Sequence, residues 1–266
     1  LMEIQNKTVL LTGASRGIGL YIAKTLANAG AVLIGLARSE DGLNATKADI
    51  ENEGGTFHTL SFDLNNISGL SELVELAIAM NGEIDILVNN AGIERYSKYQ
   101  NYSADEVRDV LNVNLRAPLE LSRVLLPTML ERGGHIVTVA SLAGKKGMAY
   151  NTPYSASKAG LIMWTDGMRQ ELRGTKVSIS VICPGYISDT GMFHDSHVDP
   201  PALLGTSKPQ AVADAVLKAI KNNSAEIIVN NGPMKPLLAL GQISPTFGDA
   251  LVRKFGVSEV SKKRIK

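Results

Sequence analysis

The chain has 266 residues, of which 44% are hydrophobic and 20% are charged. A chain of this size buries roughly 70% or more of the surface that it exposes when unfolded. The composition therefore excludes a disordered, collagen-like or disulfide-stapled protein. The formal net charge of +1 gives no reason to expect a nucleic acid partner. The single cysteine, Cys183, fits a reducing compartment, and no leader peptide or membrane-spanning run is recognisable, so we expect a cytoplasmic protein.

Short apolar runs rich in valine and isoleucine alternate with longer amphipathic stretches. Such runs are typical of strands buried on both faces, and they occur at 8–12, 32–36, 56–62, 84–88, 135–140, 177–182 and 226–229. The stretches 18–28 and 103–115 have helical periodicity, and Ser103 with Glu106 forms a capping box at the start of the second. This alternation predicts one α/β domain over residues 1–266, with a mostly parallel sheet and helices on both faces.

A glycine-rich turn follows the first predicted strand and opens the first predicted helix. Its sequence is Thr12-Gly13-Ala14-Ser15-Arg16-Gly17-Ile18-Gly19. Glycine lets the backbone approach a ligand closely, and a helix N-terminus offers free amides and a positive dipole to a pyrophosphate. We therefore expect a dinucleotide to bind at this turn. The alternative is a structural turn without a ligand.

The end of the second predicted strand lacks the carboxylate that would bind an adenosine ribose 2′-hydroxyl. Ala37 occupies that place, Arg38 follows it, and Arg16 lies within the glycine turn. Two guanidinium groups suit a 2′-phosphate through bidentate contacts. The sequence therefore favours NADP(H) over NAD(H), with two merely solvated arginines as the alternative.

Tyr154 and Lys158 are four residues apart, so on a helix they lie one turn apart on the same face. A free tyrosine has a pKa of about 10. A nearby ammonium stabilises the phenolate and lowers that pKa. Such a pair can give a proton to a carbonyl oxygen or take one from an alcohol. This spacing is common by chance, so it carries weight only together with other motifs.

The motifs together resemble the short-chain dehydrogenase/reductase family over nearly the whole chain. In family order they are the glycine turn, Asp63-Leu64, Asn89-Asn90-Ala91-Gly92, Asn114, Ser141, Tyr154 with Lys158, and Pro184-Gly185. The resemblance implies a doubly wound Rossmann fold of about seven strands, a homodimer or homotetramer, and NADP(H)-dependent interconversion of a ketone and a secondary alcohol. The alternatives are a non-catalytic NADP(H)-sensing protein, and an epimerase or dehydratase on the same fold.

The resemblance also implies a catalytic role for four residues. Tyr154 would be the acid/base, and Lys158 would lower its pKa and hold the nicotinamide ribose. Ser141 would hydrogen-bond the substrate oxygen as charge develops on it. Asn114 would anchor a water that relays protons to Lys158.

The resemblance also implies which residues line the cofactor cleft. Its residues are Gly13, Ser15, Arg16, Gly17, Ile18, Gly19, Arg38, Asp63, Leu64, Asn90, Ala91, Gly92, Tyr154, Lys158, Pro184, Gly185, Ile187 and Thr190. Asp63 would contact the adenine, beside the Leu64 amide. Thr190 stands six residues after Pro184, one more than is usual in the family, so Ser188 or the backbone could take its place.

Residues 232–266 form a basic and apolar C-terminal segment. It carries seven Lys/Arg and two Asp/Glu, a net charge of +5 against −4 for the rest of the chain. Two interpretations stay open: a packing or oligomer element, or an amphipathic patch for an anionic membrane surface. Together with the expected substrate loop at 191–208, the segment hints at a hydrophobic substrate. We expect no metal site from His194 and His197 in that loop.

Overall fold

The computed structural model describes residues 2–201, 204–232 and 234–265. Its seven parallel strands are ordered β3-β2-β1-β4-β5-β6-β7. The strands are β1 (Thr8–Thr12), β2 (Val32–Ala37), β3 (Thr56–Ser61), β4 (Ile86–Asn89), β5 (Gly134–Val139), β6 (Val177–Pro184) and β7 (Glu226–Val229). The doubly wound fold expected from the sequence is confirmed, and the strand order reverses direction between β1 and β4.

Eleven α-helices are found in the described residues. They are α1 (Ile18–Asn28), α2 (Glu40–Asn52), α3 (Leu70–Asn81), α4 (Ala104–Leu111), α5 (Ala117–Arg132), α6 (Thr152–Glu171), α7 (Gly191–His194), α8 (Pro209–Asn222), α9 (Met234–Ile243), α10 (Pro245–Lys254) and α11 (Val257–Lys263). In the part of the chain that the structure describes, none of them is long and apolar enough to cross a bilayer.

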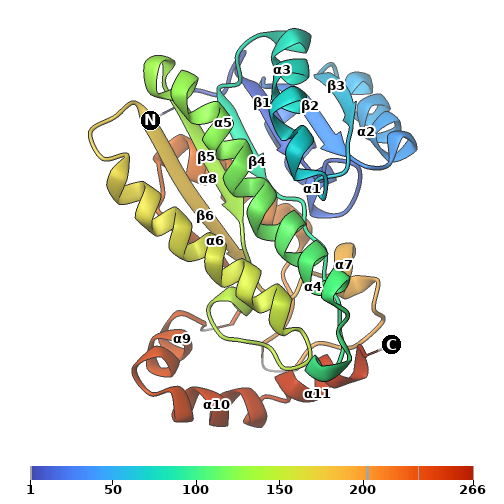
Figure 1. The fold of residues 1–266 in the computed structure, drawn as a ribbon, viewed down its shortest axis with the longest axis vertical. Coiled ribbons are helices and arrows are strands. Elements are labelled where there is room, and N and C mark those ends of the chain that lie inside the picture. Colours follow the sequence, from blue (N-terminus) through green and yellow to red (C-terminus); the bar gives the residue numbers. More distant parts are fainter. Residues whose placement is uncertain (1, 202–203, 233, 266) are drawn as a thin grey trace.

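The sheet is covered by apolar helix faces on both sides, as Figure 1 shows for α5 and α6 in front and α8 behind. On one side Ile22 and Leu26 of α1 share a core with Val212 of α8. On the other, Leu73 of α3 packs in the same cluster as Leu121 of α5. Both faces of the central strands are therefore dry, which explains why their sequences are continuous apolar runs rather than alternating ones.

The predicted helix at 103–115 differs from the structure in one respect. Its capping box is present, because Ser103 Oγ accepts from the Glu106 amide at 3.1 Å and the Glu106 carboxylate accepts from the Ser103 amide at 3.0 Å. However, α4 ends at Leu111, and residues 112–116 form a wide π-type turn before α5. The side chain of Asn114, at the centre of this turn, bonds the backbone of Ile93, which holds the helix open there.

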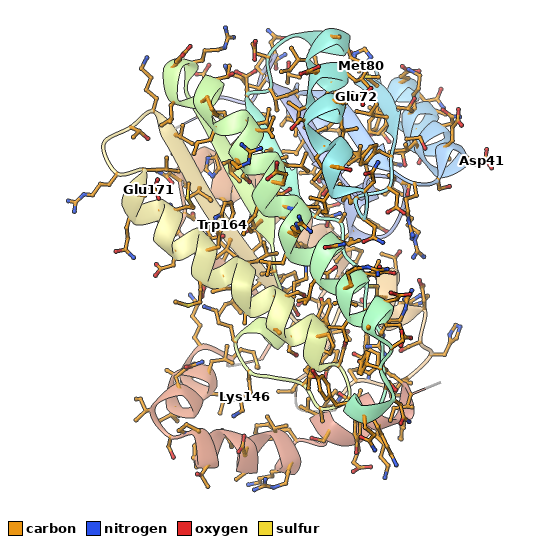
Figure 2. The ribbon with its side chains drawn as sticks, in the orientation of Figure 1. Asp41, Glu72, Met80, Lys146, Trp164 and Glu171 are labelled. Carbon is orange, nitrogen blue, oxygen red and sulfur yellow. The ribbon has the colours of Figure 1, made fainter. Side chains whose placement is uncertain are left out.

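The C-terminal segment folds into α9, α10 and α11, which lie together at one end of the molecule (Figure 1). Lys146, in the loop after β5, forms an ion pair of 2.7 Å with Asp249 of α10 and faces these helices in Figure 2. Trp164, which the same figure places on α6, packs against the core. The C-terminal segment is thus docked on the strand-end loops of the domain.

Candidate active site

The loops that follow β1, β4, β5 and β6 meet at the carboxyl edge of the sheet, where ligands bind in open α/β folds. A cavity of about 220 Å³ opens there. Ten of the residues predicted from the sequence line it: Ile18, Asn90, Gly92, Ser141, Tyr154, Lys158, Pro184, Gly185, Ile187 and Thr190. The other predicted residues do not line the cavity: Gly13, Ser15, Arg16, Gly17, Gly19, Arg38, Asp63, Leu64, Ala91 and Asn114.

The glycine turn needs glycine for two different reasons. Gly13 and Gly17 have φ angles of +71° and +62°, in the left-handed region that other residues seldom adopt. A Cβ on Gly19 would lie 1.9 Å from the Gly13 carbonyl oxygen. Gly17 caps α1 without any side-chain hydrogen bond, and the first turn of the helix contains no acidic residue. The first amides of α1 are therefore free to bind an anion.

Hydrogen bonds hold the end of β4 against the end of β1. The Thr12 hydroxyl accepts from the amides of Asn90 and Ala91, at 3.0 Å each. The Asn90 side chain donates to the Thr12 carbonyl at 3.0 Å and to the Gly13 carbonyl at 3.3 Å. The Asn90–Gly92 motif and the glycine turn are therefore one rigid unit, as a shared cofactor cleft requires.

The residues predicted for the adenosine end lie at the carboxyl ends of β2 and β3. Arg38 follows β2 and is exposed, while Asp63 follows β3 and accepts from the Asn65 amide at 3.0 Å. Leu64 is buried. Arg16 is exposed, and its guanidinium lies 3.3 Å from the Asp195 carboxylate, next to α7. Arg16 thus faces the substrate loop in this structure.

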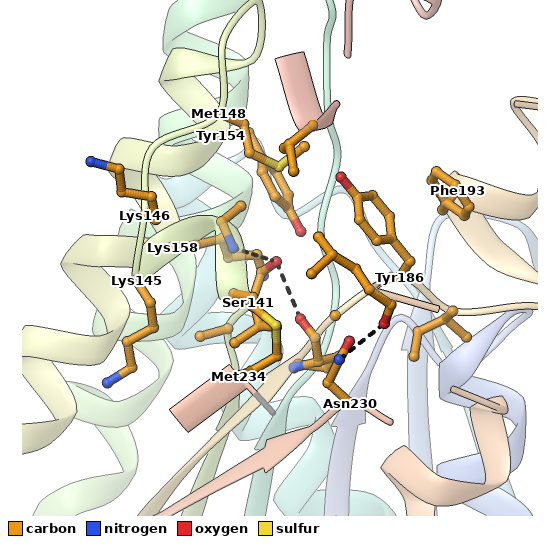
Figure 3. A pocket seen from close by; sticks show the side chains of 18 of the residues that line it. Ser141, Lys145, Lys146, Met148, Tyr154, Lys158, Tyr186, Phe193, Asn230 and Met234 are labelled. Carbon is orange, nitrogen blue, oxygen red and sulfur yellow. Dashed lines mark hydrogen bonds between the residues drawn. The ribbon is translucent and has the colours of Figure 1, made fainter. Parts of the chain in front are cut away.

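Tyr154 and Lys158 lie on one face of α6, as their spacing predicted, and both are buried, with 8% and 3% of their surface exposed. The Lys158 ammonium donates to the Val139 carbonyl at 2.8 Å and lies 5.7 Å from the centre of the Tyr154 ring. Figure 3 shows the Tyr154 hydroxyl pointing into the cavity, beside Ser141 and opposite Tyr186.

The electrostatics of the pair differ from the sequence-based expectation. Burial raises the pKa of Tyr154 above its ordinary value, the Glu94 carboxylate raises it further, and the Ser141 hydroxyl opposes both. Burial also lowers the pKa of Lys158, to about 8. The net shift of the Tyr154 pKa is upward because the loss of water around the phenol dominates, and the Lys158 ammonium donates its hydrogen bond to the Val139 carbonyl.

The side chains of Ser141 and Asn114 differ in how firmly hydrogen bonds hold them. The Ser141 hydroxyl accepts a hydrogen bond from the Ala143 amide at 3.1 Å and donates one to the Pro184 carbonyl at a long 3.5 Å. The weak donated bond can easily be redirected to another acceptor. Asn114 is completely buried, and its side chain accepts from the Ile93 amide and donates to the Ile93 carbonyl, at 2.8 Å each. Its side-chain nitrogen also donates to the Ser157 hydroxyl at 3.2 Å, so the amide ties the backbone beside the cavity to α6.

Three residues that the sequence analysis did not single out form a buried polar group on the cavity wall. They are Glu94, Tyr96 and Arg264. No signal in the sequence connects them, because Arg264 is separated from the other two by about 170 residues and lies on the C-terminal segment. Met192 and Phe193, which come shortly after the predicted Thr190, line the cavity next to this group, because Arg264 donates to the Met192 carbonyl at 2.7 Å and lies 5.3 Å from the centre of the Phe193 ring.

Known proteins resemble this chain over most of its length. A family model described as short chain dehydrogenase matches residues 7–200. The chain is 54% identical to the ketoacyl reductase HetN of Nostoc sp. strain PCC 7120, over 99% of this chain and 94% of the relative. It is 36% identical to the 3-oxoacyl-[acyl-carrier-protein] reductase FabG of Escherichia coli K12, over 85% and 94%.

Solved structures of short-chain dehydrogenases and ketoreductases also resemble this chain. An actinorhodin polyketide ketoreductase variant with NADPH matches with a TM-score of 0.78 and 29% identity, over 86% of this chain and 97% of that one. Other similar structures are described as complexes with NADP or with NAD. The comparisons therefore indicate a nicotinamide cofactor and leave the choice between its two forms open.

Proposed function

The chain belongs to the short-chain dehydrogenase/reductase family of oxidoreductases, and from this premise we propose that it reduces the ketone of 3-oxoacyl thioesters with NADPH. One observation carries the proposal: Ser141, Tyr154 and Lys158 meet in a largely apolar cavity at the carboxyl edge of the sheet. Two relatives named as ketoacyl and 3-oxoacyl reductases support the substrate class.

The residues around the glycine turn fit NADP(H), which when bound supplies the hydride. The uncapped N-terminus of α1 offers its amides to the pyrophosphate. Arg38 is exposed and directly follows β2, and it would take the 2′-phosphate, joined by the exposed Arg16 once that side chain leaves Asp195. Gly92 lies next to the Lys158 ammonium, which a Cβ at this position would approach to 3.5 Å.

The chain's own groups are arranged for proton transfer to a carbonyl oxygen. The Tyr154 pKa is raised, so the phenol carries its proton at neutral pH and can donate it to the oxygen as hydride reaches the carbon. Ser141 gives up its long bond to Pro184 and donates to the same oxygen. With a pKa of about 8, Lys158 is still mostly charged at pH 7, and it stabilises the phenolate left on Tyr154.

The test is NADPH oxidation by the purified protein, with NADH in parallel. The substrates are N-acetylcysteamine thioesters of 3-oxo acids, alongside steroids, quinones, sugars and aliphatic aldehydes. We expect turnover on the thioesters with NADPH, and a loss of about 10²–10⁴-fold in kcat for Tyr154→Phe while its NADPH affinity stays native. NADPH binding without turnover of any carbonyl would instead support the sensing protein on the same fold.

A further inference from the structure

Arg264 joins the C-terminal segment to two walls of the cavity. Its side chain is 6% exposed, although it lies just beyond the last helix. The guanidinium donates to the Tyr96 hydroxyl at 2.6 Å, to the Met192 carbonyl at 2.7 Å, and to the Glu94 carboxylate. It also lies 4.2 Å from the centre of the Tyr96 ring. A buried arginine with this many partners holds its surroundings in one geometry.

These partners belong to separate parts of the fold. Glu94 and Tyr96 come from the segment after β4, whereas Met192 belongs to α7. The middle of the C-terminal segment is tied to the loop after β5: Gln242 donates to the Lys145 carbonyl at 2.9 Å, and Lys146 pairs with Asp249. Helices α9–α11 are therefore fastened to the domain near the junction of α9 and α10 and again just after α11.

On both sides of the tie at Gln242 and Asp249 the segment presents apolar side chains to the cavity. The large apolar lining residues from α9, α10 and the turn after α10 are Met234, Leu237, Leu238, Leu251, Val252 and Phe255. On the same helices Leu240 and Ile243 do not line the cavity and are 48% and 83% exposed. The amphipathic character noted in the sequence thus has an inner face, and that face continues the cavity away from Tyr154.

The charges at this wall cancel. Arg264 is paired with Glu94, and both are largely buried, with 6% and 14% of their side chains exposed. Such a wall offers a ligand no unpaired charge, so it suits an uncharged apolar chain rather than a free carboxylate.

We propose that α9–α11 form a subsite for the acyl chain of the substrate, and that Arg264 is a positioning residue that holds this subsite over the cavity. The inference rests on the proposed function and narrows it to 3-oxoacyl thioesters of medium and long chain length. Each methylene buried against this face is worth about fourfold in affinity, so discrimination against an acetoacetyl thioester grows steeply with chain length.

The first test replaces Arg264 and measures chain-length preference. We compare kcat/KM for 3-oxododecanoyl and acetoacetyl N-acetylcysteamine thioesters in the native protein, in Arg264→Met and in the matched control Lys263→Met, whose side chain is exposed. We expect the ratio of the two values to fall at least tenfold in Arg264→Met, mainly through KM for the long substrate, and to stay native in the control. An equal loss on both substrates, which a merely structural role predicts, overturns the proposal.

A second pair of variants tests the subsite without changing Arg264, in case Arg264→Met fails to fold. Leu251→Trp narrows the proposed subsite, and Leu240→Trp adds the same bulk to an exposed position of the same segment. The long-to-short ratio is expected to fall at least tenfold in the first variant only. An unchanged ratio in Leu251→Trp refutes the subsite.

A binding measurement separates this inference from the proposed function. If the native protein reduces no 3-oxoacyl thioester, the proposed function is wrong. The subsite is then judged by calorimetric titration with the dodecanoyl thioester of N-acetylcysteamine in the presence of NADP⁺. Binding to the native protein and to Leu240→Trp, with at least tenfold weaker binding to Leu251→Trp, supports the subsite. Absence of binding to the native protein refutes it.

Discussion

Gly19→Ala is the substitution for which the structure gives the clearest magnitude. The added Cβ would lie 1.9 Å from the Gly13 carbonyl oxygen and 2.9 Å from the Asn90 side-chain nitrogen. Since a carbon and an oxygen normally approach no closer than about 3.3 Å, the turn and the helix must separate by more than about 1 Å. Overpacking of this kind costs about 1–3 kcal/mol in the free energy of unfolding.

The same displacement moves the first amides of α1 away from the pyrophosphate. A hydrogen bond to a charged group is worth about 1.5–3 kcal/mol, so losing one raises the Kd for NADPH about 10–150-fold. The assays are urea unfolding and a titration of NADPH fluorescence. The control is Gly167→Ala, in an exposed part of α6 with no atom within 4 Å of the added Cβ. It should gain about 0.5–1 kcal/mol of stability and bind NADPH normally.

Native stability and native NADPH affinity in Gly19→Ala would show that the glycine turn can shift to accommodate the added Cβ at no cost in free energy. The geometric argument for a rigid phosphate cradle would then be wrong.

Three further predictions concern charge. Arg38→Asp should lower kcat/KM for NADPH about tenfold or more relative to NADH, and an unchanged ratio would contradict the assignment of the 2′-phosphate to this arginine. Lys158 has a folded-state pKa of about 8 against 10.5, so stability is lost as the pH falls from 10.5 to 8. At pH 7 the free energy of unfolding of Lys158→Met should therefore exceed that of the native protein by up to about 3 kcal/mol, with no gain above pH 10.5. His135 is buried against Ser180, and burial lowers its pKa to about 4. Stability should fall between pH 6.5 and 4 in the native protein, and His135→Gln should lack this contribution when the two are compared by thermal melting.

Much of the candidate site could be predicted because its residues follow local rules. Tyr154 and Lys158 share a helix face by their spacing alone, and Ser141 directly follows a buried strand. Parallel strands bring their carboxyl ends to one edge, so motifs that follow β1, β4, β5 and β6 must meet. Neither step needs knowledge of how distant side chains pack.

The remaining features depend on tertiary packing. Arg264 meets Glu94 only because α9–α11 fold back over the strand ends, and the sequence holds no spacing that encodes this contact. The direction of the Tyr154 pKa depends on how much water burial removes, which is not a property of the Tyr-x-x-x-Lys motif. The sequence of the C-terminal segment is compatible with both packing and membrane binding, because its place on the cavity wall depends on contacts with distant residues.

The wide turn at 112–116 has a consequence for insertions and deletions. A π-type turn holds one residue more than an α-turn. The bulge at 112–116 absorbs this extra residue, so α4 and α5 follow one another as they would in a continuous helix. Removing one residue from this stretch would let the two helices fuse into a regular one with both apolar faces still directed at the core. Asn114 would lose its bonds to Ile93. We therefore expect the deletion of one residue here to spare the packing of α4 and α5 and to release the backbone of Ile93 beside the cavity.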